Sequence, residues 1–275
     1  MRSKSKQPIY SEEHLGYLRG VRRQKVFVNV MRYAILIFFL GLWELSAELG
    51  WVDPFIASSP SRFLATIARL YRDNNLFIHI GTTMVESIVG FAAGMVFGTL
   101  IAIMLWWSNT LLCILDPYLV VLNALPKIAL APILIVWVGA GMKSIIIMAL
   151  LVSVVVTIMT MLAGFMAITS KKQLLMHMLG ATKLQILTKV VLPASVPTLM
   201  NALKISVGMS WVGVIVGEYL VSKAGLGYLI VYGGQVFKLD LVMASIVILC
   251  VLAAAMYFAV AGLEKRLSAR YDFVQ

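Results

Sequence analysis

Few residues of this 275-residue chain have the types and spacing that chemistry needs. The three histidines, His14, His79 and His177, are scattered, and no H-E-x-x-H motif, nucleophile elbow or metal-ligand cluster occurs. The stretch from 139 to 144, GAGMKS, is the nearest approach to a phosphate-binding loop, but it lacks the adjacent Gly-Lys pair that such a loop needs. We therefore expect no catalytic, cofactor-binding or metal-binding residue in this chain.

Charged residues inside apolar stretches form a second group, which could act on a passing solute. Lys127 lies between Pro126 and Pro132 in ALPKIALAP, and Glu218 lies near the end of a later apolar stretch. A charge at the centre of a bilayer costs about 2.5–3.5 kcal/mol on insertion scales, so these residues should face protein or water. We predict that Pro126, Lys127, Pro132 and Glu218 line a translocation path. Two alternatives stay open, a proline kink with Lys127 reaching a membrane surface and a structural role for Glu218.

The composition indicates an integral membrane protein. Hydrophobic residues make up 61% of the chain and charged residues 13%, with a mean hydropathy of +0.95, which a water-soluble core could not hide. The net charge of +11 could suggest nucleic acid, but no reader motif accompanies it. Eight of the 23 basic residues precede the first apolar run, where they would meet anionic lipid.

The apolar runs predict an all-α, polytopic fold with about six transmembrane helices. Sixteen basic residues fall in the segments that this arrangement places inside and six in those outside, which predicts that both termini are cytoplasmic. We expect a basic leader at 1–32, a transmembrane domain at 33–270 with a cytoplasmic loop at about 167–197, and a tail at 271–275. The candidate spans are 33–51, 83–106, 110–138, 144–166, 198–221 and 242–263.

Two of these spans have unusual sequences. Residues 110–138 would measure about 43 Å as one straight helix, and two prolines interrupt them, so we expect a broken helix. The second span carries two overlapping G-x-x-x-G patterns, and small residues at this spacing let helices approach closely. We predict helix packing at Gly90, Gly94 and Gly98, and likewise at Gly213 and Gly217 of the fifth span.

In the expected cytoplasmic loop, a half-polar stretch from Met176 to Pro193 interrupts the hydrophobic sequence. Ser170 and Gln173 have the spacing of a capping box that would start a helix, and Gly180 permits a sharp bend. Beyond the bend, leucine and valine at helical spacing form one apolar stripe. The physics alone leaves two alternatives, a segment that a partner grips and a helix that lies on the membrane.

This stretch resembles the cytoplasmic "EAA" loop of binding-protein-dependent ABC transporter permeases. Gly180 is followed by nine residues and then by VVLP, ending at Pro193, whereas the residues from 174 to 176 are LLM in place of Glu-Ala-Ala. Three further stretches resemble the nitrate, sulfonate and taurine branch of that family. They are residues 42–63, 126–141 and 206–230, the last of which holds Glu218 and the turn G-L-G. At Glu86 we would expect a basic residue in relatives, so local pairing should differ.

The resemblance implies a type I ABC importer permease in the bacterial plasma (inner) membrane, surrounded by lipid. It implies three further partners: a pair of ATP-binding subunits that carry the ATP and Mg²⁺, an extracytoplasmic solute-binding protein and a second permease copy, with a homodimer preferred. Nucleic acid is not among them. The loop that would dock on the ATPase comprises Met178, Leu179, Gly180, Ala181, Leu184, Leu187 and Pro193.

The resemblance also suggests the solute, which is a small anion such as a sulfonate, taurine or nitrate. The same transporter class also imports thiamine-pyrimidine precursors and other small heterocycles, which is the alternative. An ion-driven secondary transporter is a further alternative. It usually shows internal repeats with paired broken helices, and this sequence has one broken span without a second copy.

Overall fold

The computed structural model describes residues 12–73, 75–168 and 175–271, and every regular element in these ranges is helical. The predicted all-α fold is therefore confirmed. The elements are α1 (Glu12–Glu48), α2 (Pro54–Ala57), α3 (Pro60–Arg72), α4 (Leu76–Trp107), α5 (Asn109–Ala124), the 3₁₀ helix η1 (Lys127–Leu130), α6 (Ala131–Val138), α7 (Met142–Met166), α9 (Lys183–Ile186), the π-helix η2 (Leu187–Val191), α10 (Leu192–Ala194), α11 (Val196–Val221), α12 (Leu226–Gln235) and α13 (Leu239–Tyr271).

Among the described residues, five helices are long and apolar enough to cross a membrane, and a bent pair of helices is a sixth candidate. The broken pair is Asn109–Ala124 with Lys127–Val138, which are bent by 89° relative to each other, as the prolines predicted. Leu125 takes an extended conformation (φ −68°, ψ 131°) because the ring of the following Pro126 disfavours helical geometry before it. The five uninterrupted spans are Tyr17–Glu48, Leu76–Trp107, Met142–Met166, Val196–Val221 and Leu239–Arg266.

The chain divides into two compact units, one up to Phe63 and one from Leu64. In the first unit, α1 begins inside the stretch expected as a basic leader and continues without a break to Glu48. Glu44 accepts hydrogen bonds from the backbone N–H of Ser61 at 2.9 Å and from its hydroxyl at 2.6 Å. These bonds hold the end of α1 against the start of α3.

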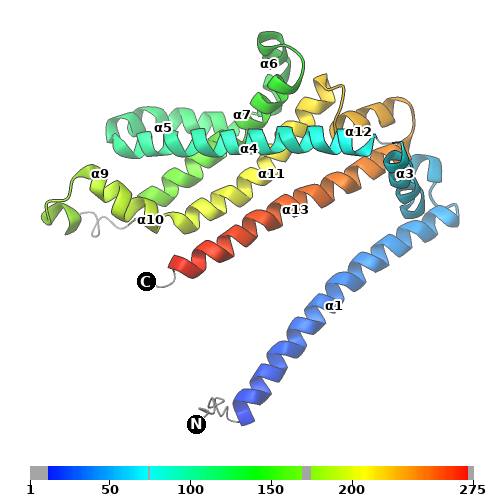
Figure 1. Ribbon diagram of the computed structural model, residues 1–275, viewed down its shortest axis with the longest axis horizontal. Coiled ribbons are helices and arrows are strands. Elements are labelled where there is room, and N and C mark those ends of the chain that lie inside the picture. The colour runs from blue at the N-terminus through cyan, green and yellow to red at the C-terminus, as the bar shows by residue number, and fades with distance from the viewer. Residues whose placement is uncertain (1–11, 74, 169–174, 272–275) are drawn as a thin grey trace, which may run out of the picture. The chain divides into compact units, whose positions relative to one another are not determined.

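In the second unit, α7 is the central helix, and α4 and α11 both pack against it. Figure 1 shows α4, α7 and α11 crossing within this unit, with α13 running along α11. The glycines of α4 face small side chains of α7. A Cβ atom on Gly94 would lie 2.1 Å from the hydroxyl of Ser153, and one on Gly98 would lie 2.7 Å from the Cβ of Thr157. Only glycine lets the two backbones approach this closely.

Helix α11 packs against α7 in the same way. A Cβ atom on Gly213 would lie 2.5 Å from the Cα of Ala149, and one on Gly217 would lie 3.1 Å from the Cα of Ile145. Gly90 of α4 also faces Ala149, whose Cβ a side chain there would meet at 2.5 Å. One turn of α7 is therefore packed between glycines of two different helices.

Candidate functional site

The cytoplasmic loop forms a helical turn, a sharp bend and a second helix. Residues 175–178 are helical, and the turn ends at Gly180, whose φ of +75° favours glycine. The N–H of Gly180 donates to the carbonyl of His177, and the N–H of Ala181 donates to the carbonyl of Met176, both at 3.0 Å. These bonds satisfy the carbonyls that the helix end leaves free, and they fix the direction in which the chain leaves the bend.

The second helix begins at a capping box that the sequence analysis missed. The Thr182 hydroxyl accepts from the backbone N–H of Gln185 at 3.3 Å, and the Gln185 side-chain oxygen accepts from the N–H of Thr182 at 2.8 Å. The spacing T-x-x-Q, two residues after Gly180, indicated this helix start in the sequence. The capping box expected at Ser170 and Gln173 lies outside the described residues.

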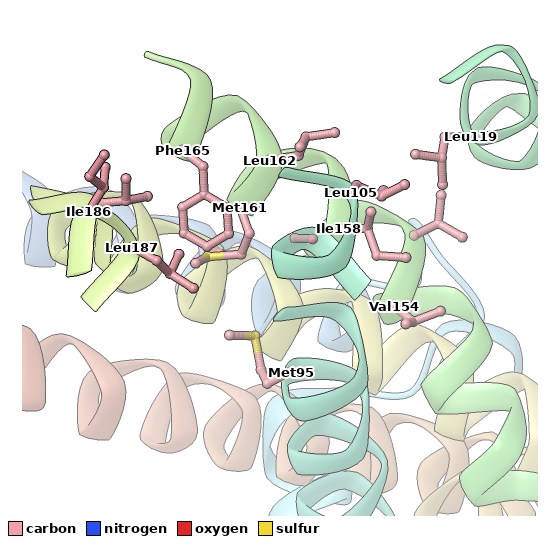
Figure 2. Packing of buried hydrophobic residues seen from close by; sticks show 14 residues of the cluster. Met95, Leu105, Leu119, Val154, Ile158, Met161, Leu162, Phe165, Ile186 and Leu187 are labelled. Atoms are coloured by element: carbon pink, nitrogen blue, oxygen red, sulfur yellow. The ribbon is translucent and has the colours of Figure 1, made fainter. Parts of the chain in front are cut away.

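Exposure divides the loop into a buried root and an exposed tip. Ile186 and Leu187 are 2% and 6% exposed, and Figure 2 shows them beside Phe165 and Met161 of α7. Met178 and Leu179 are instead 76% and 72% exposed. We call residues 175–182, which include these exposed side chains, the docking tip. Leu187, which the sequence predicted as a docking residue, is instead buried in the apolar cluster and belongs to the root of the loop.

The end of the loop next to the root contains a π-helix, η2, and Pro193. Pro193 stands in α10, directly after the wider turns of η2. Val191 is fully buried in the same cluster as Ile186, so η2 places two apolar side chains on the bundle side. Leu184, one turn before η2, remains 59% exposed beside the tip.

Lys183 connects this loop to the end of α4. Its Nζ donates to the carbonyl oxygen of Trp107, the last residue of α4, at 2.5 Å. The same atom lies 5.6 Å from the ring centre of Trp107 and 5.8 Å from that of Trp106, within the range of a cation–π interaction. A lysine at the C-terminal end of a helix also meets the negative end of the helix dipole.

A second polar cluster lies where α11 turns into α12. Glu218, 1% exposed, accepts from the N–H of Gly227 at 2.5 Å, the N–H of Tyr228 at 3.4 Å and the hydroxyl of Thr83 at 2.6 Å. The Thr83 hydroxyl also accepts from the N–H of Leu226 at 2.8 Å. Glu218 and Thr83 thus satisfy the first free N–H groups of α12, and the carboxylate meets the positive end of its dipole.

The G-L-G turn is shaped by this carboxylate. A Cβ atom on Gly225 would lie 2.4 Å from the Glu218 carboxyl group, and one on Gly227 would lie 2.8 Å from its Oε2. The N–H of Gly225 donates to Nδ1 of His79 at 3.0 Å, which fastens the turn to α4 a second time. Through these contacts, Glu218 acts as a structural partner that stabilises the G-L-G turn.

Glu86 lies beside Glu218 in the same buried cluster. It is also 1% exposed, and its carboxyl group interacts with that of Glu218. Its Oε2 has no hydrogen-bond partner in the part of the chain that the structure describes. The two acids therefore meet across α4 and α11.

The remaining path candidates lie at the break between α5 and α6. Nζ of Lys127 donates to the carbonyl oxygen of Asn123 at 3.2 Å, across the bend, and Pro132 stands in the first turn of α6. The contacts of Lys127 and those of Glu218 involve different residues, so the structure does not join them into one site. Over the described ranges, no group of three or more His, Cys, Asp and Glu side chains could hold a metal ion.

Residues 90–271, which include the docking tip and the Glu218 turn, match the family model described as "Binding-protein-dependent transport system inner membrane component". The chain belongs to this family. This assignment confirms the resemblance that the loop around Gly180 had indicated, and it identifies the chain as a multi-pass membrane protein.

Named relatives support the same family. A probable ABC transporter permease protein of Haemophilus influenzae is 32% identical over 230 residues, covering 82% of this chain and 92% of the relative. The taurine transport system permease protein TauC of Escherichia coli is 25% identical over 257 residues, covering 92% of each. The formylaminopyrimidine transport permease protein ThiX of Halalkalibacterium halodurans is 29% identical over 195 residues, covering 70% of this chain and 77% of the relative.

A solved structure shows the same fold. An inward-facing conformation of the MetNI methionine ABC transporter superposes with a TM-score of 0.62 at 20% identity, covering 69% of this chain and 94% of that one. The family and this fold make the chain a permease of type I ABC importers. Such permeases are not enzymes themselves.

Proposed function

We propose that the chain is the transmembrane subunit of an ATP-driven importer, and that two copies of it form the translocation path. A pair of ATP-binding subunits grips the docking tip from the cytoplasm, and an extracytoplasmic solute-binding protein delivers the solute. The observation that carries this proposal is the divided exposure of the loop, with Ile186 and Leu187 buried while Met178 and Leu179 are exposed.

The docking tip is suited to a protein partner. Burying a side chain of the size of Met178 or Leu179 stabilises a complex by about 1.5–3 kcal/mol relative to leaving it in water. The bend at Gly180 and the cap at Thr182 fix these side chains before a partner arrives, which lowers the entropy lost on binding. ATP and Mg²⁺ would be held by that partner.

The placement of charge supports a bacterial inner-membrane location with both termini in the cytoplasm. Basic residues concentrate in the leader and in the loop that holds the docking tip, which the positive-inside rule places on the cytoplasmic side. The same rule puts the Glu218 turn on the outer side, near the surface that a solute-binding protein would approach.

The translocation path is proposed to run beside the break between α5 and α6. Pro126 and Pro132 bound this break, and Lys127 supplies a positive charge there that attracts an anion. Glu218 contributes by holding the turn before α12. Reconstituted transporter with Lys127→Met tests the path, because unchanged anion uptake by a normally assembled complex would remove Lys127 from it.

The proposed solute is a small anion of the sulfonate, taurine or nitrate type, which the name of the Escherichia coli relative favours. The second candidate is a thiamine-pyrimidine precursor, favoured by the formylaminopyrimidine permease among the relatives. Radiolabelled taurine uptake in the presence of excess unlabelled aminopyrimidine or nitrate separates the two. Competition by only one class identifies the solute class.

The test of the transporter itself is purification of the tagged chain from its native membrane in mild detergent, with mass spectrometry of the proteins that copurify. We expect a stoichiometric P-loop ATPase that is lost with Gly180→Leu. The matched control is Gly50→Leu, because Gly50 has a similar φ of +70° and equally open surroundings but lies outside the loop. Recovery of the chain alone, active in ion-driven uptake without ATP, would instead establish a secondary transporter whose loop lies on the membrane.

A further inference from the structure

The docking tip is joined to the bundle at two different places. Its root, Ile186 and Leu187, packs in the apolar cluster with Phe165 of α7. Its other attachment is Lys183, whose Nζ is bonded to the carbonyl oxygen of Trp107. The same cluster holds Leu105 of α4 and Leu119 of α5, so Lys183 adds a polar contact with α4 to the apolar one.

The Lys183 contact lies at the junction of α4 and α5. Trp107 ends α4, and the hydroxyl of Ser108, the next residue, accepts from the N–H of Leu111 at 3.3 Å as the cap of α5. The N–H of Ser108 donates to Met104, so the carbonyl of Trp107 lies beyond the helical bonds of α4 and is available to Lys183. From this junction α5 leads directly to the 89° break before η1.

The charge at position 183 has a defined role in this geometry. A lysine ammonium can donate to a helix-end carbonyl and sit over indole rings at once, and both interactions act on the same end of α4. Lys189, on the same loop, is exposed, and the root is apolar. Removing the charge of Lys183 should therefore leave the root in place and free only the junction.

We infer that Lys183 is a positioning residue that transmits movement of the docking tip to the α4–α5 junction and so to the broken span. The inference rests on the proposed function, since it assumes that an ATPase moves the tip. With this contact, closure of the ATP-binding subunits displaces the end of α4. Without it, movement of the tip reaches α5 only through the apolar cluster, and α5 moves less.

The experiment uses the complete transporter in proteoliposomes, with Mg²⁺ and ATP as the ligand. An environment-sensitive fluorophore on Cys113 reports the position of α5 in a Cys250→Ser background, because Cys113 is exposed in the second turn of α5. The compared variants are Lys183→Met, Lys183→Arg, which keeps the charge and the donor, and Lys189→Met, which removes a charge from the same loop. The ATPase rate and the ATP-dependent fluorescence change are measured together.

We expect Lys183→Met to hydrolyse ATP at the normal rate while the fluorescence change at Cys113 falls about tenfold, the size expected for losing one charged hydrogen bond. Lys183→Arg and Lys189→Met should retain the change. A full change in Lys183→Met would overturn the inference and leave the proposed function standing. Absence of ATPase activity and of any change in the unaltered protein would overturn both.

Assembly provides a second measurement. The inference expects all three variants to retain the ATP-binding subunits. If Lys183→Met loses them, Lys183 belongs to the docking contact itself and the inference falls, whether or not Lys183→Arg restores them.

Discussion

The contact between α11 and α7 makes a quantitative prediction for Gly213→Ala. The added Cβ would lie 2.5 Å from the Cα of Ala149 and 3.0 Å from the carbonyl oxygen of Met148, both of them backbone atoms. Carbon atoms in contact normally lie about 3.5–4.0 Å apart, so the two helices must separate by about 1 Å. Overpacking of this kind costs about 1–3 kcal/mol, and the better helix propensity of alanine offsets only about 1 kcal/mol.

Gly208→Ala is the matched control on the same helix. No heavy atom lies within 4 Å of a Cβ at Gly208, so this variant gains the propensity without the clash. We expect Gly213→Ala to be less stable than Gly208→Ala by the overpacking cost, about 1–3 kcal/mol, which corresponds to about 2–12 °C in Tm for a chain of this size. Thermal unfolding in detergent, followed by tryptophan fluorescence, measures the difference. Equal midpoints for the two variants would refute the packing argument.

Four further substitutions test the remaining contacts. Glu218→Ala leaves the N–H of Gly227 buried without its acceptor and should lower the free energy of unfolding by about 2–4 kcal/mol, and chemical unfolding that shows no loss would contradict this. Thr182→Ala removes the cap of α9, so it should cost about 1 kcal/mol and speed amide hydrogen exchange there, whereas unchanged exchange would argue against the cap. Ile186→Ala should cost about 2–4 kcal/mol by opening a cavity under the docking tip. Leu184→Ala should leave stability unchanged while it weakens retention of the ATPase, and the reverse pattern would show that the two faces of the loop are misassigned.

The helical content and the break in the third span could be predicted because their causes are local. A run of about 20 apolar residues can cross a bilayer only as a closed helix, and Pro126 disfavours helical geometry at the residue before it whatever surrounds it. The bend at Gly180 is similar, since its φ of +75° is a conformation in which glycine is favoured. The capping box at Thr182 was also local, and it was missed because Ser170 offered the same pattern earlier in the loop.

The sequence could not predict which residues the charged side chains contact. Glu218 meets Thr83 across 135 positions of the chain, and Lys183 meets Trp107 across 76, and no local pattern encodes such distances. The glycine spacing indicated close packing, but which helix would fill each face depended on how α7 lies between α4 and α11.

The sequence by itself therefore determined which stretches are long and apolar enough to cross a membrane and where the third of them is broken, because backbone hydrogen bonding and hydrophobicity act over a few turns. Only the tertiary structure decided that Glu218 holds a turn, that Leu187 is buried while Leu179 is exposed, and that Lys183 fastens the loop to α4. These features arise when helices distant in sequence pack together, since packing decides which side chains lose contact with water and which charges find a partner.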